Sequence, residues 1–156
     1  MEIQFKKREG QKHSIRYIRE GYPDHWIEAD DFLVLHDLCH YAIETCLGYK
    51  NAFWGMISKG IDLEVFLDKQ KRDQLIISNE AWYAEHLANL FLIEYSQGPF
   101  EDLNQTLSET LQQTHPQLPA IRYTDEEIAG IRTRVQELIS QWRGFPSGEM
   151  LMLVFS

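Results

Sequence analysis

Both ends of the chain carry short stretches in which apolar and polar residues alternate. Residues 2–8 and 13–19 show this alternation with β-branched and aromatic residues, and the segment 9–12 between them has the composition of a turn. This pattern predicts an antiparallel hairpin. The segment 149–155 is a short apolar run that follows Pro146, Ser147 and Gly148, and we expect it to form a third strand that pairs with the hairpin.

The middle of the chain has the periodicity of helices. Asp30 can cap a first helix that ends at Gly48, and Gly98 with Pro99 ends another that begins near Ser78. The periodicity over residues 62–73 is weaker. The predicted helices cover residues 30–48, 50–59, 78–96, 101–113 and 125–142. These elements predict a single α+β domain over residues 1–156, with about five helices packed on a small antiparallel sheet made by both termini.

The first predicted helix combines an apolar stripe with a polar line. His36, His40 and Glu44 follow one another along the edge of the stripe, with Asp37 further round, which suits the wall of a pocket. Five aromatic residues are expected either to pack in the core or to line an apolar pocket: Trp26, Phe53, Trp54, Trp82 and Tyr83. The stripe itself is expected to contain Phe32, Leu35, Cys39, Ala42, Ile43 and Cys46.

Composition and charge limit the class of protein and the partners that can be expected. The chain is 44% hydrophobic and 25% charged, as in a soluble globular protein, and its formal net charge of -9 disfavours nucleic acid and anionic membranes as partners. It has no apolar run near the roughly 20 residues of a membrane span and no signal-peptide core. Cys39 and Cys46 lie too far apart along one helix for a disulfide, so buried thiols in a reducing cytoplasm are expected.

The histidine pair predicts a metal site. Two histidines four residues apart lie on one helix face and can bind one ion, for which zinc is the expected choice. Zinc needs a third protein ligand, and Glu80 and Glu85 on the 78–96 helix are better placed for this than Glu44, which is two turns from His36. Asp37 and Glu44 are then candidates for acid/base catalysis or for orienting an imidazole.

Three motif resemblances bear on this site. The strings HDLCH at 36–40 and NEAWYAE at 79–85 resemble the two metal-binding helices of gluzincin metallopeptidases. That resemblance implies His36, His40 and Glu80 as ligands and Asp37 as the general base, although Asp is shorter than the usual Glu. HDLCH also resembles the HDxxH zinc motif of a ubiquinone-biosynthesis family, whose downstream glutamate corresponds to Ala52 here, and the His-Asp pair of HD-domain phosphohydrolases.

A longer resemblance covers about half of the chain. Small bacterial proteins with no established activity carry an HDLxHxxxE helix followed by a Gly-Phe/Trp-Gly segment, which corresponds to Ala52–Gly55 here. The resemblance implies a bacterial origin. The sequence thus predicts a metal-binding protein. Its expected activity is the metal-dependent hydrolysis of a small molecule or peptide. The alternative is a non-enzymatic binding or interaction protein in which the His/Asp/Glu line is a structural polar network.

Overall fold

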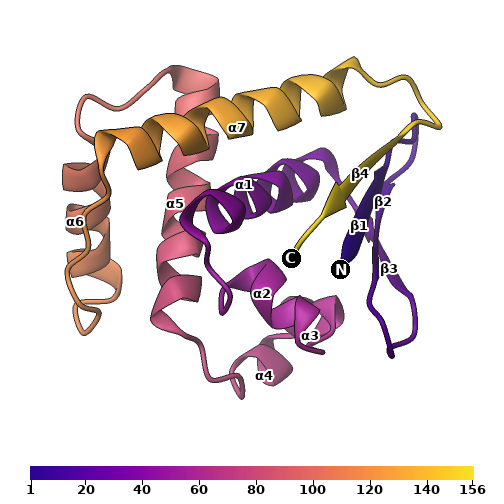
Figure 1. The fold of residues 1–156 in the computed structure, drawn as a ribbon, viewed down its shortest axis with the longest axis horizontal. Helices are drawn as coiled ribbons and strands as arrows, with labels where there is room; N and C mark the ends of the chain where they lie inside the picture. Colours follow the sequence, from indigo (N-terminus) through magenta and orange to yellow (C-terminus); the bar gives the residue numbers. More distant parts are fainter.

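Four strands form one antiparallel sheet in the computed structural model, which describes residues 1–156 apart from the side chain of Leu67. The strand order is β3-β2-β1-β4, so the two termini lie side by side, with the C-terminal strand at one edge of the sheet (Figure 1). The strands are β1 (Glu2–Lys6), β2 (His13–Ile18), β3 (His25–Ala29) and β4 (Met150–Val154).

The predicted pairing of the C-terminal segment with the hairpin is confirmed. β4 runs antiparallel to β1, with Phe5 opposite Leu151. The Tyr41 hydroxyl donates a hydrogen bond of 2.9 Å to the carbonyl of Val154, which ties the strand to the first helix. β3 was not predicted, because five residues after a Gly-Tyr-Pro turn give only a brief alternation.

The structure has seven helices across residues 1–156, where about five were predicted. The difference lies in the weak 62–73 segment. It forms two short helices that meet at Asp68, whose carboxylate caps the second by accepting from the amides of Gln70 and Lys71. The helices are α1 (Asp31–Leu47), α2 (Phe53–Ser58), α3 (Leu63–Leu67), α4 (Lys69–Arg72), α5 (Asn79–Gln97), α6 (Leu103–Thr114) and α7 (Asp125–Gly144).

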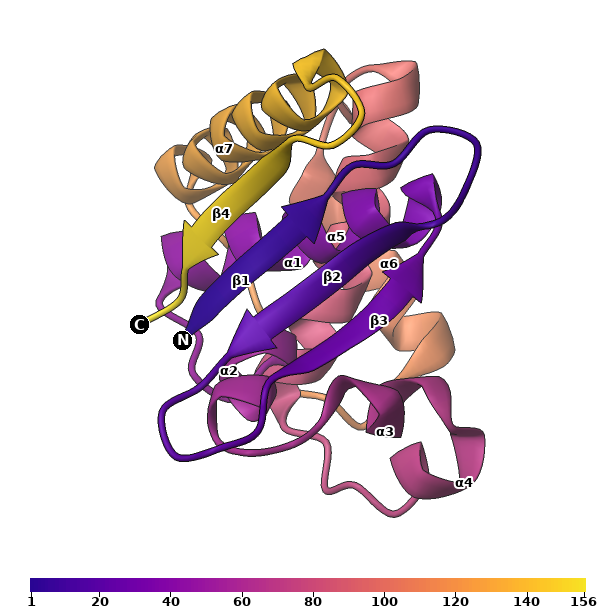
Figure 2. The ribbon, with the colours of Figure 1, turned by 90° about the vertical axis from the view of Figure 1, so that its right-hand side faces the viewer.

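The helices cover one face of the sheet and leave the other face open, as Figure 2 shows. The strands alternate accordingly: Ile3 and Phe5 point into the core, whereas Met152 and Val154 on the open face are exposed. Behind the sheet, α1 packs against both α5 and α7. None of the helices in the described part of the chain combines the length and apolar character needed to cross a bilayer.

The predicted core stripe of α1 is wrong at its ends. Phe32 is 64% exposed and the Cys46 thiol is also exposed, whereas Val34 and Leu38 are buried. Because α1 is surrounded by the sheet, α5 and α7, every residue from 37 to 44 is buried and the two ends of the helix are not. Cys39 is buried as predicted, and both cysteines are free thiols.

Candidate functional site

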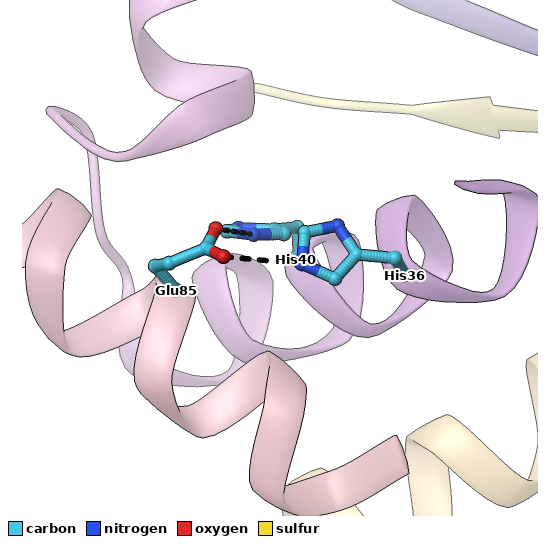
Figure 3. A group of neighbouring side chains, drawn as sticks. All are labelled: His36, His40 and Glu85. Carbon is cyan, nitrogen blue, oxygen red and sulfur yellow. Dashed lines mark hydrogen bonds and ion pairs between the residues drawn. The ribbon is translucent and has the colours of Figure 1, made fainter. Parts of the chain in front are cut away.

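A histidine pair on α1 faces a single carboxylate on α5 (Figure 3). His36 Nε2 lies 3.5 Å from Glu85 Oε1, and His40 Nε2 lies 3.1 Å from Glu85 Oε2. The spacing of the histidines by one helical turn puts both rings on the same side of α1, with centroids 4.7 Å apart. Each carboxylate oxygen is therefore matched to one imidazole nitrogen.

These three residues can hold a metal ion. One ligand atom from each lies within 4.8 Å of the other two. Bonds of about 2.0–2.1 Å to a tetrahedral zinc place two ligand atoms roughly 3.3 Å apart. The separations of 3.1 and 3.5 Å between the carboxylate and the imidazoles bracket that value. Two of the three separations between ligand atoms therefore already match those of a zinc site.

The other nitrogen of each imidazole also faces a carboxylate. Asp37 Oδ1 lies 3.6 Å from His36 Nδ1, and Glu44 Oε1 lies 3.4 Å from His40 Nδ1. A carboxylate on the far side of a ligating histidine holds the proton on Nδ1 and leaves Nε2 free for the metal. Both separations are at or beyond the limit of a hydrogen bond, and His40 Nδ1 has no hydrogen-bond partner within the described residues, so Asp37 and Glu44 would set this tautomer after a small shift toward the rings.

Glu44 is also part of the framework around the site. It is 1% exposed, and its two oxygens accept hydrogen bonds of 3.1 and 3.0 Å from the amides of Trp54 and Gly55. These are amides in the first turn of α2, which have no partner within the helix. The Trp54 indole in turn donates a 3.0 Å hydrogen bond to the carbonyl of Asp37. The Ala52–Gly55 segment therefore locks α2 onto the back of the histidine helix.

The structure does not bring Glu80 to the histidines. Its carboxylate accepts hydrogen bonds from the amides of Lys50 and Asn51, at 2.9 and 2.7 Å, and so closes the loop between α1 and α2. Glu80 and Glu85 are five residues apart, which turns them about 140° from one another around the helix axis. Of the third ligands left open by the sequence, the geometry selects Glu85. The available signal was that Glu80 lies in the first turn of its helix, where carboxylates commonly bind free backbone amides.

The histidines and carboxylates of the site shift the pKa values of one another. Burial acts to lower the pKa of His40, but the carboxylates of Glu44 and Glu85 outweigh it and raise the pKa to about 9. The pKa of His36 is raised in the same way by Asp37 and Glu85 against burial. Burial acts to raise the pKa of Glu85, yet the two histidines hold it well below its usual range. The cluster therefore attracts cations, and protons compete with a metal for it.

Asp37 differs from the other acids. It is 1% exposed, and burial raises its pKa while His36 opposes the shift. Within the described part of the chain, its Oδ2 atom is buried without a hydrogen-bond partner. An unpartnered buried oxygen is costly in a purely structural role, so Asp37 is the acid best suited to take part in chemistry.

The group borders a cavity of about 920 Å³ between α1 and α5. His36, Asp37, His40 and Glu85 contribute to one part of its wall, and Arg72 and Asp73 contribute from α4 and the residue after it. Of the predicted aromatic set, Phe53 and Trp82 line it, Trp54 and Tyr83 are buried in the core, and Trp26 is exposed on the sheet. Other apolar wall residues include Met56, Leu63, Phe66, Leu75 and Ile77.

Comparison of the chain with protein-family models, with curated protein sequences and with solved structures finds no significant match. The resemblances of HDLCH and NEAWYAE remain motif-level predictions. The geometry of the site is therefore the basis for inferring what the protein does.

Proposed function

We propose that the protein binds one divalent ion, zinc by preference, through His36, His40 and Glu85, and that it is a metal-dependent hydrolase. The observation that carries the proposal is that both ring nitrogens of each histidine face a carboxylate. Each Nε2 faces an oxygen of Glu85, and each Nδ1 faces a second carboxylate. Two imidazoles and one carboxylate with free space beside them are the ligand set of catalytic rather than structural zinc sites.

The reaction class follows from what the site contains. A bound ion would supply Lewis acidity, which activates water and polarises a carbonyl group. In a hydrolysis, water adds its oxygen to the acyl carbon, the bond to the leaving oxygen or nitrogen breaks, and the leaving group takes a proton. The step consumes no oxidant or reductant, and the apolar cavity gives the substrate a place to bind next to the ligands.

Asp37 and Glu44 receive different roles in this proposal. In this proposal Asp37, which borders the cavity and has a buried oxygen without a partner within the described residues, accepts a proton from water at the site. Glu44 is already bound to two amides of α2. We assign Glu44 to positioning His40, and Asp37 alone to acid/base catalysis.

The assignment of Glu85 gives a sharp test with a matched control. Protein purified without a histidine tag is equilibrated with zinc, passed through a desalting column and analysed for metal. We expect about one zinc per chain for the parent protein and for Glu80→Gln, and a loss of at least tenfold in affinity for Glu85→Gln. Equal zinc retention by Glu85→Gln and the parent protein would overturn the ligand set.

The non-enzymatic alternative has one specific observation in its favour, which is the use of both Glu44 oxygens as a cap for α2. If the whole line were structural, the parent protein would bind zinc no better than Glu85→Gln. The zinc content of the purified proteins therefore decides between the two functions, because loss of the pairing of Glu85 with His36 and His40 lowers the stability of Glu85→Gln under either function. The free thiols Cys39 and Cys46 support a reducing compartment such as the cytoplasm under either function.

A further inference from the structure

The wall of the cavity beside the metal ligands is mainly apolar. Nine of its fifteen lining residues are apolar, with Phe53, Phe66, Leu75 and Trp82 among them. Its volume of about 920 Å³ lies near the upper end of the roughly 300–1,000 Å³ of small-molecule sites. The space is therefore large enough for a hydrocarbon body of substantial size.

The polar groups of the wall come from two separate places. The histidines, Asp37 and Glu85 come from α1 and α5, whereas Arg72 and Asp73 come from the end of α4. In Figures 1 and 2, α4 lies on the far side of α3 from α1. A ligand that spans the cavity thus meets polar side chains at the histidines and again at Arg72 and Asp73, with apolar wall between them.

The elements around the cavity argue against an extended peptide. Each of the lining residues that the structure describes belongs to a helix or to the segment between α4 and α5, and none belongs to a strand. Helices satisfy their backbone groups internally, so they offer no strand edge with which a peptide can form main-chain hydrogen bonds. Most of the wall therefore offers apolar side chains rather than backbone groups, with polar side chains at the metal ligands and at Arg72 and Asp73.

We propose that the substrate is an amphipathic acyl compound, with its carbonyl group at His36, His40 and Glu85 and its hydrocarbon chain along Phe53, Phe66 and Trp82. This inference rests on the proposed hydrolase function and specifies its substrate. Hydrolysis of an ester or amide of such an acyl group releases the carboxylic acid and the alcohol or amine.

Alkyl hydroxamates test this inference, because the hydroxamate group binds zinc and the alkyl chain probes the cavity. Binding of the series from acetyl to decanoyl hydroxamate is measured by calorimetry on the zinc-loaded protein. We expect the affinity to rise about fourfold for each added methylene until the cavity is filled. A hydroxamate of a dipeptide with the same number of heavy atoms should bind at least tenfold more weakly than the alkyl compound.

A variant pair on one loop locates the hydrocarbon chain. Leu75 lines the cavity, and its neighbour Ile76 does not line it and is 97% exposed. Leu75→Asn should weaken the binding of decanoyl hydroxamate about tenfold and leave acetyl hydroxamate unchanged, whereas Ile76→Asn should bind both as the parent protein does. Both substitutions lie between α4 and α5, so neither interrupts a helix.

The outcomes separate this inference from the proposed function. Affinity that depends on zinc but not on chain length, or a preference for the peptide, overturns the acyl substrate and leaves the metal site standing. If no zinc is bound, the hydrolase proposal fails. The binding of free fatty acids of increasing length to the same protein then decides whether the cavity still selects an acyl chain.

Discussion

His40 and Glu44 are one helical turn apart on α1, and their side chains meet with Nδ1 of the imidazole 3.4 Å from Oε1 of the carboxylate. The same carboxylate accepts hydrogen bonds from the first amides of α2. Glu44 thus joins the orientation of a metal ligand to the position of the next helix.

Glu44→Gln is expected to destabilise the protein. The variant amide can accept one of the two backbone hydrogen bonds, but its NH2 group faces the donor of the other. Leaving a buried donor without an acceptor costs about 1–3 kcal/mol, which a denaturant titration will resolve. Zinc affinity should fall as well, because the His40 ring loses its orienting partner. Unchanged stability would contradict the capping role.

Asp37→Asn should behave differently, although Asp37 is equally buried. Its Oδ2 atom has no partner within the described residues, and burial raises its pKa, so removing the charge relieves a desolvation cost. We expect an unchanged or higher melting temperature together with a zinc affinity reduced about 10–100-fold, through the loss of the carboxylate beside His36. A clear drop in melting temperature would instead place Asp37 in the structural framework.

The elements that sequence pattern could identify are the ones with long or well-marked periodicity. α1 and α5 have side-chain caps at Asp30 and Ser78 and glycines after their last turns, so their extents were close to those predicted. The pairing of β4 with β1 followed from a short apolar run near the end of the chain. β3 was missed because its alternation covers only five residues, and the break between α3 and α4 because it depends on one side chain, Asp68, capping the short α4.

The two histidine ligands of the candidate site could be predicted from the sequence. The carboxylates that face them could not. Spacing alone identified His36 and His40, since residues four apart share a helix face. The choice between Glu80 and Glu85 depends on the rotation of α5 about its axis relative to α1, which no local pattern in α5 records. The role of Glu44 depends on where α2 folds back, and that is fixed by the close approach of Gly55 to the Lys50 carbonyl.

Gly55→Ala tests that close approach. A Cβ atom at Gly55 would lie 2.4 Å from the Lys50 carbonyl oxygen, so the α1–α2 loop must shift and the Glu44 cap must loosen. We expect a loss of about 1–3 kcal/mol in unfolding free energy and weaker zinc binding. Gly130→Ala is the matched control: it lies inside α7 with nothing within 4 Å of the added atom, so it should stabilise the protein by up to about 1 kcal/mol. Similar effects of the two substitutions would refute the steric explanation.

Protein stripped of metal by a chelator should lose stability at alkaline pH through His40. Its pKa of about 9 lies above the ordinary value of 6.5, because the carboxylates of Glu44 and Glu85 outweigh burial. The stability that this protonation contributes is fully present below about pH 6.5 and is lost as the pH rises through about 9. Glu85 has the opposite sign. Its lowered pKa contributes stability that is present above its ordinary value of 4.5 and is lost as the pH falls.

The melting temperature of the chelated protein is therefore expected to be highest between about pH 5 and 7 and to decline toward pH 10. Zinc and protons compete for the same imidazole nitrogens, so the stabilisation by excess zinc should grow over the interval in which the chelated protein weakens. Glu85→Gln removes one of the carboxylates that raises the pKa of His40 and also a metal ligand. The melting temperature of Glu85→Gln should begin to fall at a lower pH than that of the parent protein, and zinc should no longer restore it. A chelated parent protein that melts at one temperature from pH 6 to 10 would show that His40 is not protonated in the folded chain.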